Sequence, residues 1–310
     1  MEKIIELQKQ EQPQQRTQEW YLQRNKRITA SEASSCLTRS ELYCKNYVEE
    51  FNIKNFKYSN VRYMNPYKSR DEYILDKCKA SYGHDVFFSN DAMKWGNKYE
   101  NVAFNLYSNI YNTKVYEFGL LKHPKLDWIG ASPDGISDKG ILLEIKCPTK
   151  RQIGGTPPLY YWVQMQIQME VCDIDYCDFM ECLIEEIDFE KWKTLEISEN
   201  FQHVGILIDK NNEEYIYSDD GIFEKQDYIK WSNEIIKNNE NFKPIYFFVK
   251  KYTITRVKRS KEWFENSKEQ LENTFKKINE IQNDRIMFDN LLEKHGCEDD
   301  KPEEDAKCIL

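Results

Sequence analysis

The sequence of 310 residues lacks an excess of positive charge. Its 44 Lys and Arg stand against 53 Asp and Glu, which gives a formal net charge of −9 and a pI of about 5.3. This balance excludes a protein that coats nucleic acid by bulk positive charge, although a local basic cleft remains compatible with it. Histidine is also scarce, and the four positions are too scattered to indicate a metal site: His84, His123, His203 and His295.

Long apolar runs and internal repeats are absent too. No run approaches the ~20 residues that a membrane-spanning helix needs, and the polar, Gln-rich residues 1–15 contain no apolar stretch of a secretory signal. We therefore expect an intracellular protein without a transmembrane segment, in a reducing compartment where its nine Cys are free thiols. With 40% hydrophobic and 31% charged residues, the chain has the composition of a folded globular protein.

The hydrophobic pattern predicts an α/β core. Apolar residues at spacings of three and four predict helices over 91–111, 157–172 and 261–295, and strand-like segments cover 114–121, 127–135, 140–147, 176–184 and 245–257. The order helix, three strands, helix, strand is typical of an α/β domain. We predict a flexible arm over 1–15, a main domain over 16–260, a helical extension over 261–295 and an acidic tail over 296–310. Residues 38–90 are expected to form irregular helices, and the acidic residues 185–227 are expected to be irregular.

The most informative stretch is a predicted hairpin that carries two carboxylates and a lysine. It reads Ala131-Ser-Pro-Asp-Gly135 and then Leu143-Glu-Ile-Lys-Cys-Pro148. Alternation along the second strand puts Glu144 and Lys146 on one face. A three-residue loop with a left-handed Gly140 makes opposed residues sum to 278, so Asp134 faces Glu144 with Cβ atoms roughly 5 Å apart. Such carboxylates repel unless a hard divalent cation lies between them or one is protonated. The alternatives are a two-residue loop, which sets Asp134 against Leu143, and an exposed hairpin with a surface ion pair.

The pattern Asp134-(x9)-Glu144-x-Lys146 resembles the core of the PD-(D/E)XK nucleases, and the two longer strings resemble the lambda exonuclease and YqaJ-type viral recombinase branch. Three further strings resemble motifs of that branch in the expected order: Glu19-Trp-(x3)-Arg24-(x3)-Ile28-Thr-Ala-Ser-Glu32, Trp95-Gly-Asn-Lys-Tyr-Glu-Asn101 and Tyr161-Trp-Val-Gln164-Met-Gln-Ile-Gln-Met169. The core motifs span residues 19–184.

The resemblance implies a restriction-endonuclease-like core of helices flanking a central mixed sheet, here followed by a strand and helix extension. It also implies a metal-dependent 5′→3′ exonuclease acting on double-stranded DNA ends in recombination, repair or viral DNA processing. A structure-specific or single-strand endonuclease on the same core is an alternative. A DNA-end-binding accessory protein without catalysis is another, of a different class. Richness in Lys, Asn, Ile and Tyr hints at an AT-rich genome such as that of a large DNA virus.

Site residues follow from the same resemblance. The implied catalytic residues are Asp134, Glu144, Lys146 and Gln164. The implied ligands of one or two Mg²⁺ ions, for which Mn²⁺ can substitute, are Glu100, Asp134, Glu144 and the backbone carbonyl of Ile145. The alternatives without a catalytic role are that Glu100 lies at the border of the apolar face of its helix and that Gln164 is a buried structural glutamine.

A second site is implied for the 5′-phosphate of the DNA, with Arg24, Thr29, Ser31, Lys150 and Arg151 as its binding residues. The sequence Thr29-Ala-Ser-Glu32 also fits a capping box, with Thr29 as N-cap and Glu32 at N3. Residues 241–261 hold seven basic residues and no acid. They either contact the DNA backbone or form a solvated strand edge; the candidate contacts are Lys250, Lys251, Arg256, Lys258 and Arg259.

The implied partners are double-stranded DNA ends, a single-strand annealing protein and further copies of the chain in a trimer. Trp20, Trp95 and Tyr161 are interpreted as core residues. Cys172, Cys177 and Cys182, with Cys36 or Cys147 as a fourth thiolate, form a weaker hypothesis of an iron–sulfur cluster.

Overall fold

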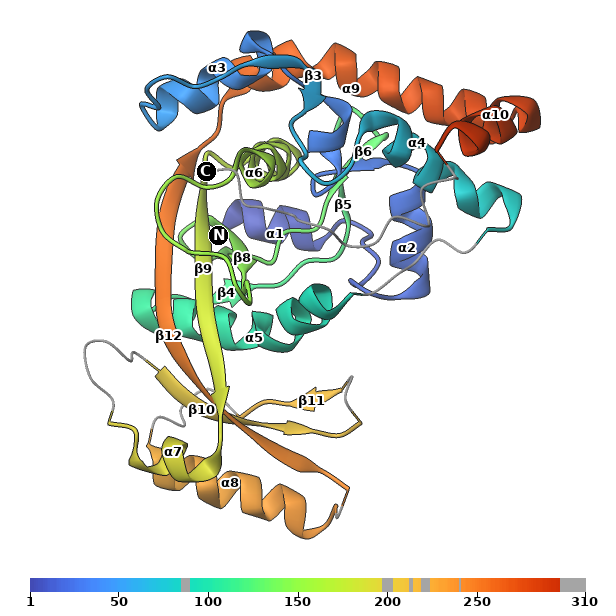
Figure 1. The fold of residues 1–310 in the computed structure, drawn as a ribbon. Helices are drawn as coiled ribbons and strands as arrows, with labels where there is room; N and C mark the ends of the chain where they lie inside the picture. Colours follow the sequence, from blue (N-terminus) through green and yellow to red (C-terminus); the bar gives the residue numbers. More distant parts are fainter. Residues whose placement is uncertain (85–89, 197–202, 212–213, 219–223, 240, 296–310) are drawn as a thin grey trace.

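The central feature of the fold is a mixed sheet with the strand order β11-β10-β12-β9-β8-β7-β4 (Figure 1). The computed structural model describes residues 1–84, 90–196, 203–211, 214–218, 224–239 and 241–295. Within them, β8 and β9 pair in parallel, whereas every other pair of neighbours in this sheet is antiparallel. The strands are β4 (Val115–Tyr116), β7 (Gly135–Ser137), β8 (Leu142–Lys146), β9 (Tyr176–Ile187), β10 (His203–Asp209), β11 (Tyr215–Ile216) and β12 (Lys243–Lys258).

Two helices cover the two faces of this sheet. Helix α5 (Asp91–Tyr111) packs Tyr99 and Leu106 against Leu143 and Ile145 of β8. Helix α6 (Leu159–Cys172) lies in the other core, to which β8 contributes Leu142. The alternation along β8 thus divides its side chains between two cores, because successive residues of a strand point to opposite faces. The predicted helices over 91–111 and 157–172 and the mixed α/β fold, with helices flanking a central sheet, are confirmed.

The strands β9 and β12 form a long ribbon that leaves the main body and enters a second lobe (Figure 1). The register shifts between Val249 and Lys251, which marks a β-bulge. The lobe adds β10, β11, α7 (Phe189–Thr194) and α8 (Lys225–Lys237), and its own apolar core includes Trp192, Ile206 and Tyr228. The expectation that 185–227 is irregular was wrong for the residues of this range that the structure describes, because short apolar segments between the acidic residues become buried when they pack against β12.

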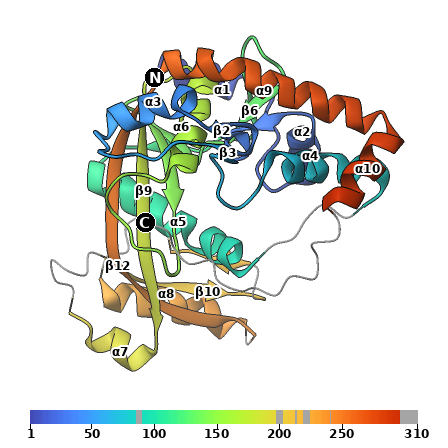
Figure 2. The same cartoon turned by 45° about the horizontal axis from the view of Figure 1, so that its top comes forward.

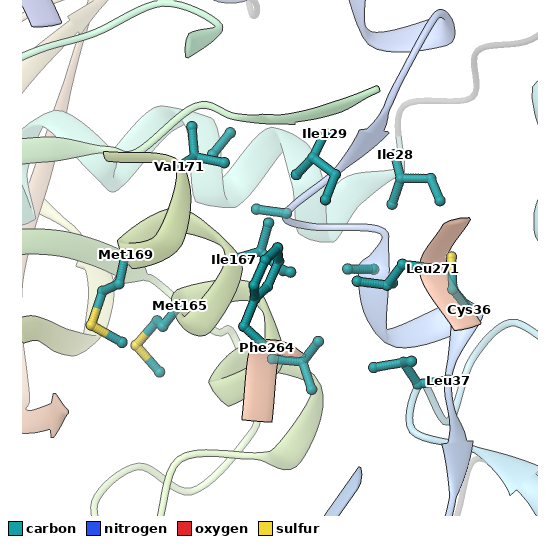
Figure 3. Close-up of a cluster of buried hydrophobic side chains, with 14 of the residues drawn as sticks. Ile28, Cys36, Leu37, Ile129, Met165, Ile167, Met169, Val171, Phe264 and Leu271 are labelled. Carbon is teal, nitrogen blue, oxygen red and sulfur yellow. The ribbon is translucent and has the colours of Figure 1, made fainter. Parts of the chain in front are cut away.

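Both ends of the described chain enter the core of the main body. Helix α1 (Glu2–Gln8) buries Ile4 and Leu7, and α9 (Lys261–Gln282) buries Trp263 and Leu271 in the same cluster. Figure 2 shows α9 lying across the top of this body, and Figure 3 shows side chains of α6 and α9 in the cluster. The predicted flexible arm over 1–15 is therefore corrected: two apolar side chains suffice to pack its first turns. The helices predicted over 261–295 are confirmed as α9 and α10 (Arg285–His295). The predicted tail over 296–310 lies outside the described residues.

The remaining elements surround α6 and α9. A small sheet β1-β6-β5 consists of β1 (Ile28–Thr29), β6 (Ile129–Ala131) and β5 (Leu121–Lys122), and a second pairs β2 (Thr38–Arg39) with β3 (Ser59–Tyr63). The helices here are α2 (Gln18–Asn25), α3 (Glu41–Glu50) and α4 (Arg70–Lys79), with the short 3₁₀ turns η1 (Ala33–Cys36) and η2 (Ala80–Tyr82). In the part of the chain that the structure describes, none of the helices combines the length and apolar character that a membrane crossing requires.

Candidate active site

The predicted hairpin has the expected register. Gly135 pairs with Leu143 and Ile136 with Leu142, so opposed residues sum to 278. Gly140 has a φ of 74° and its amide donates to the carbonyl of Ser137 at 2.8 Å, which closes the three-residue loop. Continuing this register places Asp134 opposite Glu144, at the end of the β7–β8 pair.

Glu144 lies at the centre of a buried hydrogen-bonded cluster. Its side chain is fully buried. Nε2 of Gln164 donates to its Oε1 and Nε2 of Gln168 donates to its Oε2, both at 2.7 Å. The ammonium of Lys146 forms an ion pair with Oε1. These three donors compensate the desolvation of the carboxylate, which would otherwise be costly.

Asp134 and Glu100 share the electrostatic environment of Glu144. Burial, and then the charges of Glu144 and Glu100, raise the pKa of Asp134 well above its usual range, although the amide of Ile145 donates to its Oδ2 at 2.6 Å. The pKa of Glu100 is also raised, first by burial and further by Glu144, against the opposing effect of the Arg16 guanidinium at 2.7 Å. The three predicted carboxylates therefore belong to one centre, in which their negative charges oppose one another.

Lys146 is the counter-charge of this centre. Burial disfavours its ammonium, but the carboxylates of Glu144 and Asp134 and the nearby Tyr161 outweigh this and raise its pKa above the ordinary value. The side chain retains 26% exposure and its ammonium lies 4.9 Å from the centroid of the Tyr161 ring. The ammonium is therefore charged at neutral pH and reachable from solvent.

The oxygen donors of this centre match the preference of Mg²⁺ or Mn²⁺ for hard ligands. In the described residues, however, no group of three or more Asp, Glu, His or Cys side chains is arranged so that it could hold a metal ion. The side chains explain this, because Glu144 is held by Lys146 and two glutamines while Glu100 is paired with Arg16. The donor chemistry fits a divalent cation, and the carboxylates would have to exchange these partners to bind it.

The second predicted site brings Arg24 and Ser31 together. The guanidinium of Arg24 donates to Oγ of Ser31 at 3.2 Å, lies 3.6 Å from Glu32 and stacks 4.4 Å from the centroid of the Trp20 ring. The predicted capping box is wrong. Thr29 lies in β1, which pairs with β6 far along the chain, and its hydroxyl is buried and donates to Glu32 at 2.5 Å.

Residues 12–20 connect this second site to the hairpin. Trp20 donates from Nε1 to Oγ of Ser132 at 2.9 Å, and Gln15 donates to the carbonyls of Phe118 and Pro133. Asp134 is the next residue in the chain after Ser132 and Pro133, which receive these hydrogen bonds. The N-terminal segment therefore supports the turn that presents Asp134, and Trp20 and Tyr161 are half-buried residues at the border of the core rather than inside it.

The other predicted DNA-binding residues differ in their exposure and in the ion pairs that they form. Lys150 is exposed, whereas Arg151 pairs with the buried Glu181 at 2.6 Å. Arg256 makes two hydrogen bonds to the buried Asp178, and Arg259 is 7% exposed and pairs with Glu170 and Asp173. These arginines compensate acids of the fold, while Lys250 pairs with Glu185 and Lys251 donates to the carbonyl of Ile153. DNA contacts of the arginines and of the lysines all remain predictions: Lys150, Arg151, Lys250, Lys251, Arg256, Lys258 and Arg259.

The cysteine hypothesis finds no support in the described part of the chain. All seven cysteines there are buried and free, and they form no group that could hold a metal ion. Burial raises the pKa of Cys172 to about 12, which keeps its thiol protonated. The iron–sulfur cluster is therefore corrected to buried apolar packing.

Sequence reasoning missed Gln168. It lies one helical turn after Gln164, so that both amides point to the same face of α6, towards Glu144. The signal was available in the sequence, because residues 153–169 contain no charge and have three glutamines at alternate positions, 164, 166 and 168.

Comparisons with known proteins show which family and which structures the chain is similar to. The family model of the YqaJ-like viral recombinase domain matches residues 57–175. This match confirms the resemblance to the YqaJ-type viral recombinases, and it includes Glu100, Asp134, Glu144, Lys146 and Gln164 but neither Arg24 nor Ser31.

The uncharacterized protein R354 of Acanthamoeba polyphaga mimivirus is 32% identical over 252 residues, which cover 64% of this chain and 45% of that protein. The chain thus spans less than half the length of this relative. The alkaline exonuclease LHK-Exo of Laribacter hongkongensis, solved with dAMP, aligns with a TM-score of 0.48 at 20% identity over 91% of this chain and 99% of that one. A phage-related exonuclease from Haemophilus somnus aligns with a TM-score of 0.46 at 14% identity over 82% of this chain and 94% of that one.

Proposed function

We propose that this protein is a divalent-metal-dependent deoxyribonuclease that degrades one strand of linear double-stranded DNA from its 5′ end. The observation that carries the proposal is the centre in which the part-exposed Asp134, Glu100 and charged Lys146 lie around the fully buried Glu144 and affect its electrostatic environment. Burying the Glu144 carboxylate next to two further acids is costly for a purely structural site, and it is typical of sites that handle a charged substrate.

In this proposal Glu100, Asp134, Glu144 and the carbonyl of Ile145 would hold one or two Mg²⁺ or Mn²⁺ ions. Such ions supply Lewis-acid stabilisation of the negative charge that develops on the phosphate. Lys146 provides a charged donor at the solvent-facing side of the centre, where it would orient the attacking water or a phosphate oxygen. Gln164 and Gln168 fix the position of the Glu144 carboxylate, and Arg24 with Ser31 would hold the terminal 5′-phosphate.

The test is digestion of end-labelled linear duplex DNA in Mg²⁺. Lys146→Ala should abolish cleavage while DNA binding persists, and EDTA should stop the wild-type protein. Lys139→Ala is the matched control, because Lys139 lies in the loop of the same hairpin and donates only to the carbonyl of Tyr111. Full activity of Lys146→Ala would contradict the assignment.

Two further comparisons separate the alternatives. Arg24→Ala should erase a preference for 5′-phosphorylated over 5′-hydroxyl ends, since it removes the forked donor. Circular duplex DNA should remain intact, and its cleavage would favour an endonuclease. A lack of product with both Mg²⁺ and Mn²⁺ would favour a DNA-end-binding accessory protein. The trimer and the annealing partner are part of the same proposal, and the mass in solution tests the first.

A further inference from the structure

Three tyrosine rings stand in series beside Lys146. The ring of Tyr161 lies next to the Lys146 ammonium, the Tyr160 ring lies 4.2 Å from that of Tyr161, and the Tyr67 ring lies 5.7 Å from that of Tyr160 at an angle of 80°. Tyr160 and Tyr161 are half-buried at the start of α6, whereas Tyr67 is 76% exposed. The series therefore runs from the candidate active centre to the protein surface.

Tyr67 is held in position although it is exposed. Its amide donates to Oδ1 of Asn65 at 2.9 Å, and Nδ2 of the same side chain donates to Oγ of Ser35 at 2.9 Å. Asn65 thereby ties the loop to η1, whose Ser35 is buried. These hydrogen bonds restrain the backbone at Tyr67, so the binding of a ligand to its ring would cost less conformational entropy of the loop.

The contact of the Tyr67 ring with Tyr160 contributes little to stability, so it does not account for a large apolar ring at the surface. One edge contact between aromatic rings contributes only about 0.5–1.5 kcal/mol. A single exposed aromatic side chain is ordinary on a protein surface, but Tyr67 continues a series that ends at a catalytic lysine. Burial and the neighbouring hydroxyls of Tyr161 and Tyr67 raise the pKa of Tyr160, so its phenol stays neutral and the rings present uncharged faces and edges.

Positive charge flanks the inner end of the series. Besides Lys146, the guanidinium of Arg151 lies 5.8 Å from the centroid of the Tyr161 ring while it pairs with Glu181, and Lys150 is exposed next to it. Aromatic rings beside lysine and arginine are the arrangement that binds single-stranded nucleic acid, because bases stack on the rings while phosphates pair with the cations. A duplex would offer its bases to these rings only after the pairs had separated.

We propose that Tyr67, Tyr160 and Tyr161 form a stacking platform for the bases of unpaired nucleotides in the DNA strand that enters the centre at Lys146. This inference rests on the proposed nuclease function and adds that the terminal nucleotides of the degraded strand are unpaired when they contact the rings beside Lys146. Tyr67 is a binding residue in this arrangement, and the outermost contact for the incoming strand.

The experiment measures binding of a 5′-phosphorylated single-stranded oligonucleotide by fluorescence anisotropy in EDTA, with the full chain. Stacking of one base on an aromatic ring is worth about 1–3 kcal/mol, so Tyr67→Ala should weaken binding by about fivefold or more. Tyr67→Trp should bind within about twofold of wild type. Ile286→Ala is the exposure-matched control, because Ile286 is 73% exposed on α10.

A second oligonucleotide separates stacking from other causes. It has the same phosphates but abasic sugars at its first four positions. Tyr67→Ala and wild type should bind it equally, because the ring then has no base to contact. Equal binding of the intact oligonucleotide by both proteins, or an equal loss on both oligonucleotides, would overturn the platform.

The two proposals fail separately. If the wild-type protein cleaves linear duplex DNA and Tyr67→Ala binds the intact strand normally, only the platform is refuted. If no DNA is cleaved with any metal and the base-dependent effect of Tyr67 persists, only the nuclease function is refuted.

Discussion

The substitution Glu32→Gln should lower the free energy of unfolding by about 3 kcal/mol at pH 7. Glu32 forms an ion pair at 2.8 Å with the buried Lys77 and lies near Arg24. Burial alone would raise the pKa of Glu32, but Lys77 and Arg24 reverse this and lower it to about 2 from an ordinary value of 4.5. Each pKa unit corresponds to about 1.4 kcal/mol, which gives the stated magnitude.

The pH dependence has a defined direction. Because the pKa of Glu32 is lower in the folded protein, its stabilisation is present above about pH 4.5 and is lost as the pH falls towards 2. Urea unfolding followed by Trp fluorescence should therefore show a difference between wild type and Glu32→Gln that is less than half as large at pH 3 as at pH 7. The same difference at both pH values would refute the reasoning.

A double substitution is the control. Lys77 is 4% exposed in its side chain, and burial lowers its own pKa despite the attraction of Glu32. Removing one partner leaves a buried charge, whereas Glu32→Gln combined with Lys77→Met removes the pair. The double variant should be more stable than the sum of the two single effects predicts, and strict additivity would show that the two side chains do not interact.

Two further substitutions test the packing around the site. Arg256→Met should lower the free energy of unfolding, measured in urea, by about 3 kcal/mol, because the 1% exposed Asp178 loses the side chain that donates two hydrogen bonds to it. Lys250→Met removes an exposed ion pair and should cost less than about 1 kcal/mol. Equal effects of the two substitutions would contradict this reasoning. Gly119→Ala should release the N-terminal helix, since the added Cβ would meet the carbonyl of Pro13; faster hydrogen exchange of residues 2–8 is the measurement, and unchanged protection would refute it.

The sequence sufficed for the hairpin because its determinants are local. A glycine that accepts a left-handed conformation at position 140 and the two-residue period of a strand together fix which residues oppose each other. The resemblance then identified which of these side chains form the centre. Helix α5 could also be predicted from the sequence, because its helical spacing of apolar residues continues over 21 residues.

The features that sequence reasoning missed depend on partners far along the chain. Thr29 pairs with Gly130 across the sheet, which overrides its local preference to cap a helix. The contribution of α1 to the core, and the order of the second lobe, likewise arise only when distant segments bury short apolar patches. The contact between the Tyr67 and Tyr160 rings was not visible either, because these residues lie 93 positions apart in the sequence.

The sharing of one core by α1 and α9 has a consequence for the synthesis of the chain. Leu7 and Trp263 are separated by more than 250 residues. At a ribosomal rate of roughly 5–20 residues per second, the N-terminal helix leaves the ribosome at least roughly 10 s before its partner exists. During that interval the apolar faces of α1 and α6 lack the contacts that α9 supplies, so the nascent chain exposes apolar surface that is prone to aggregation.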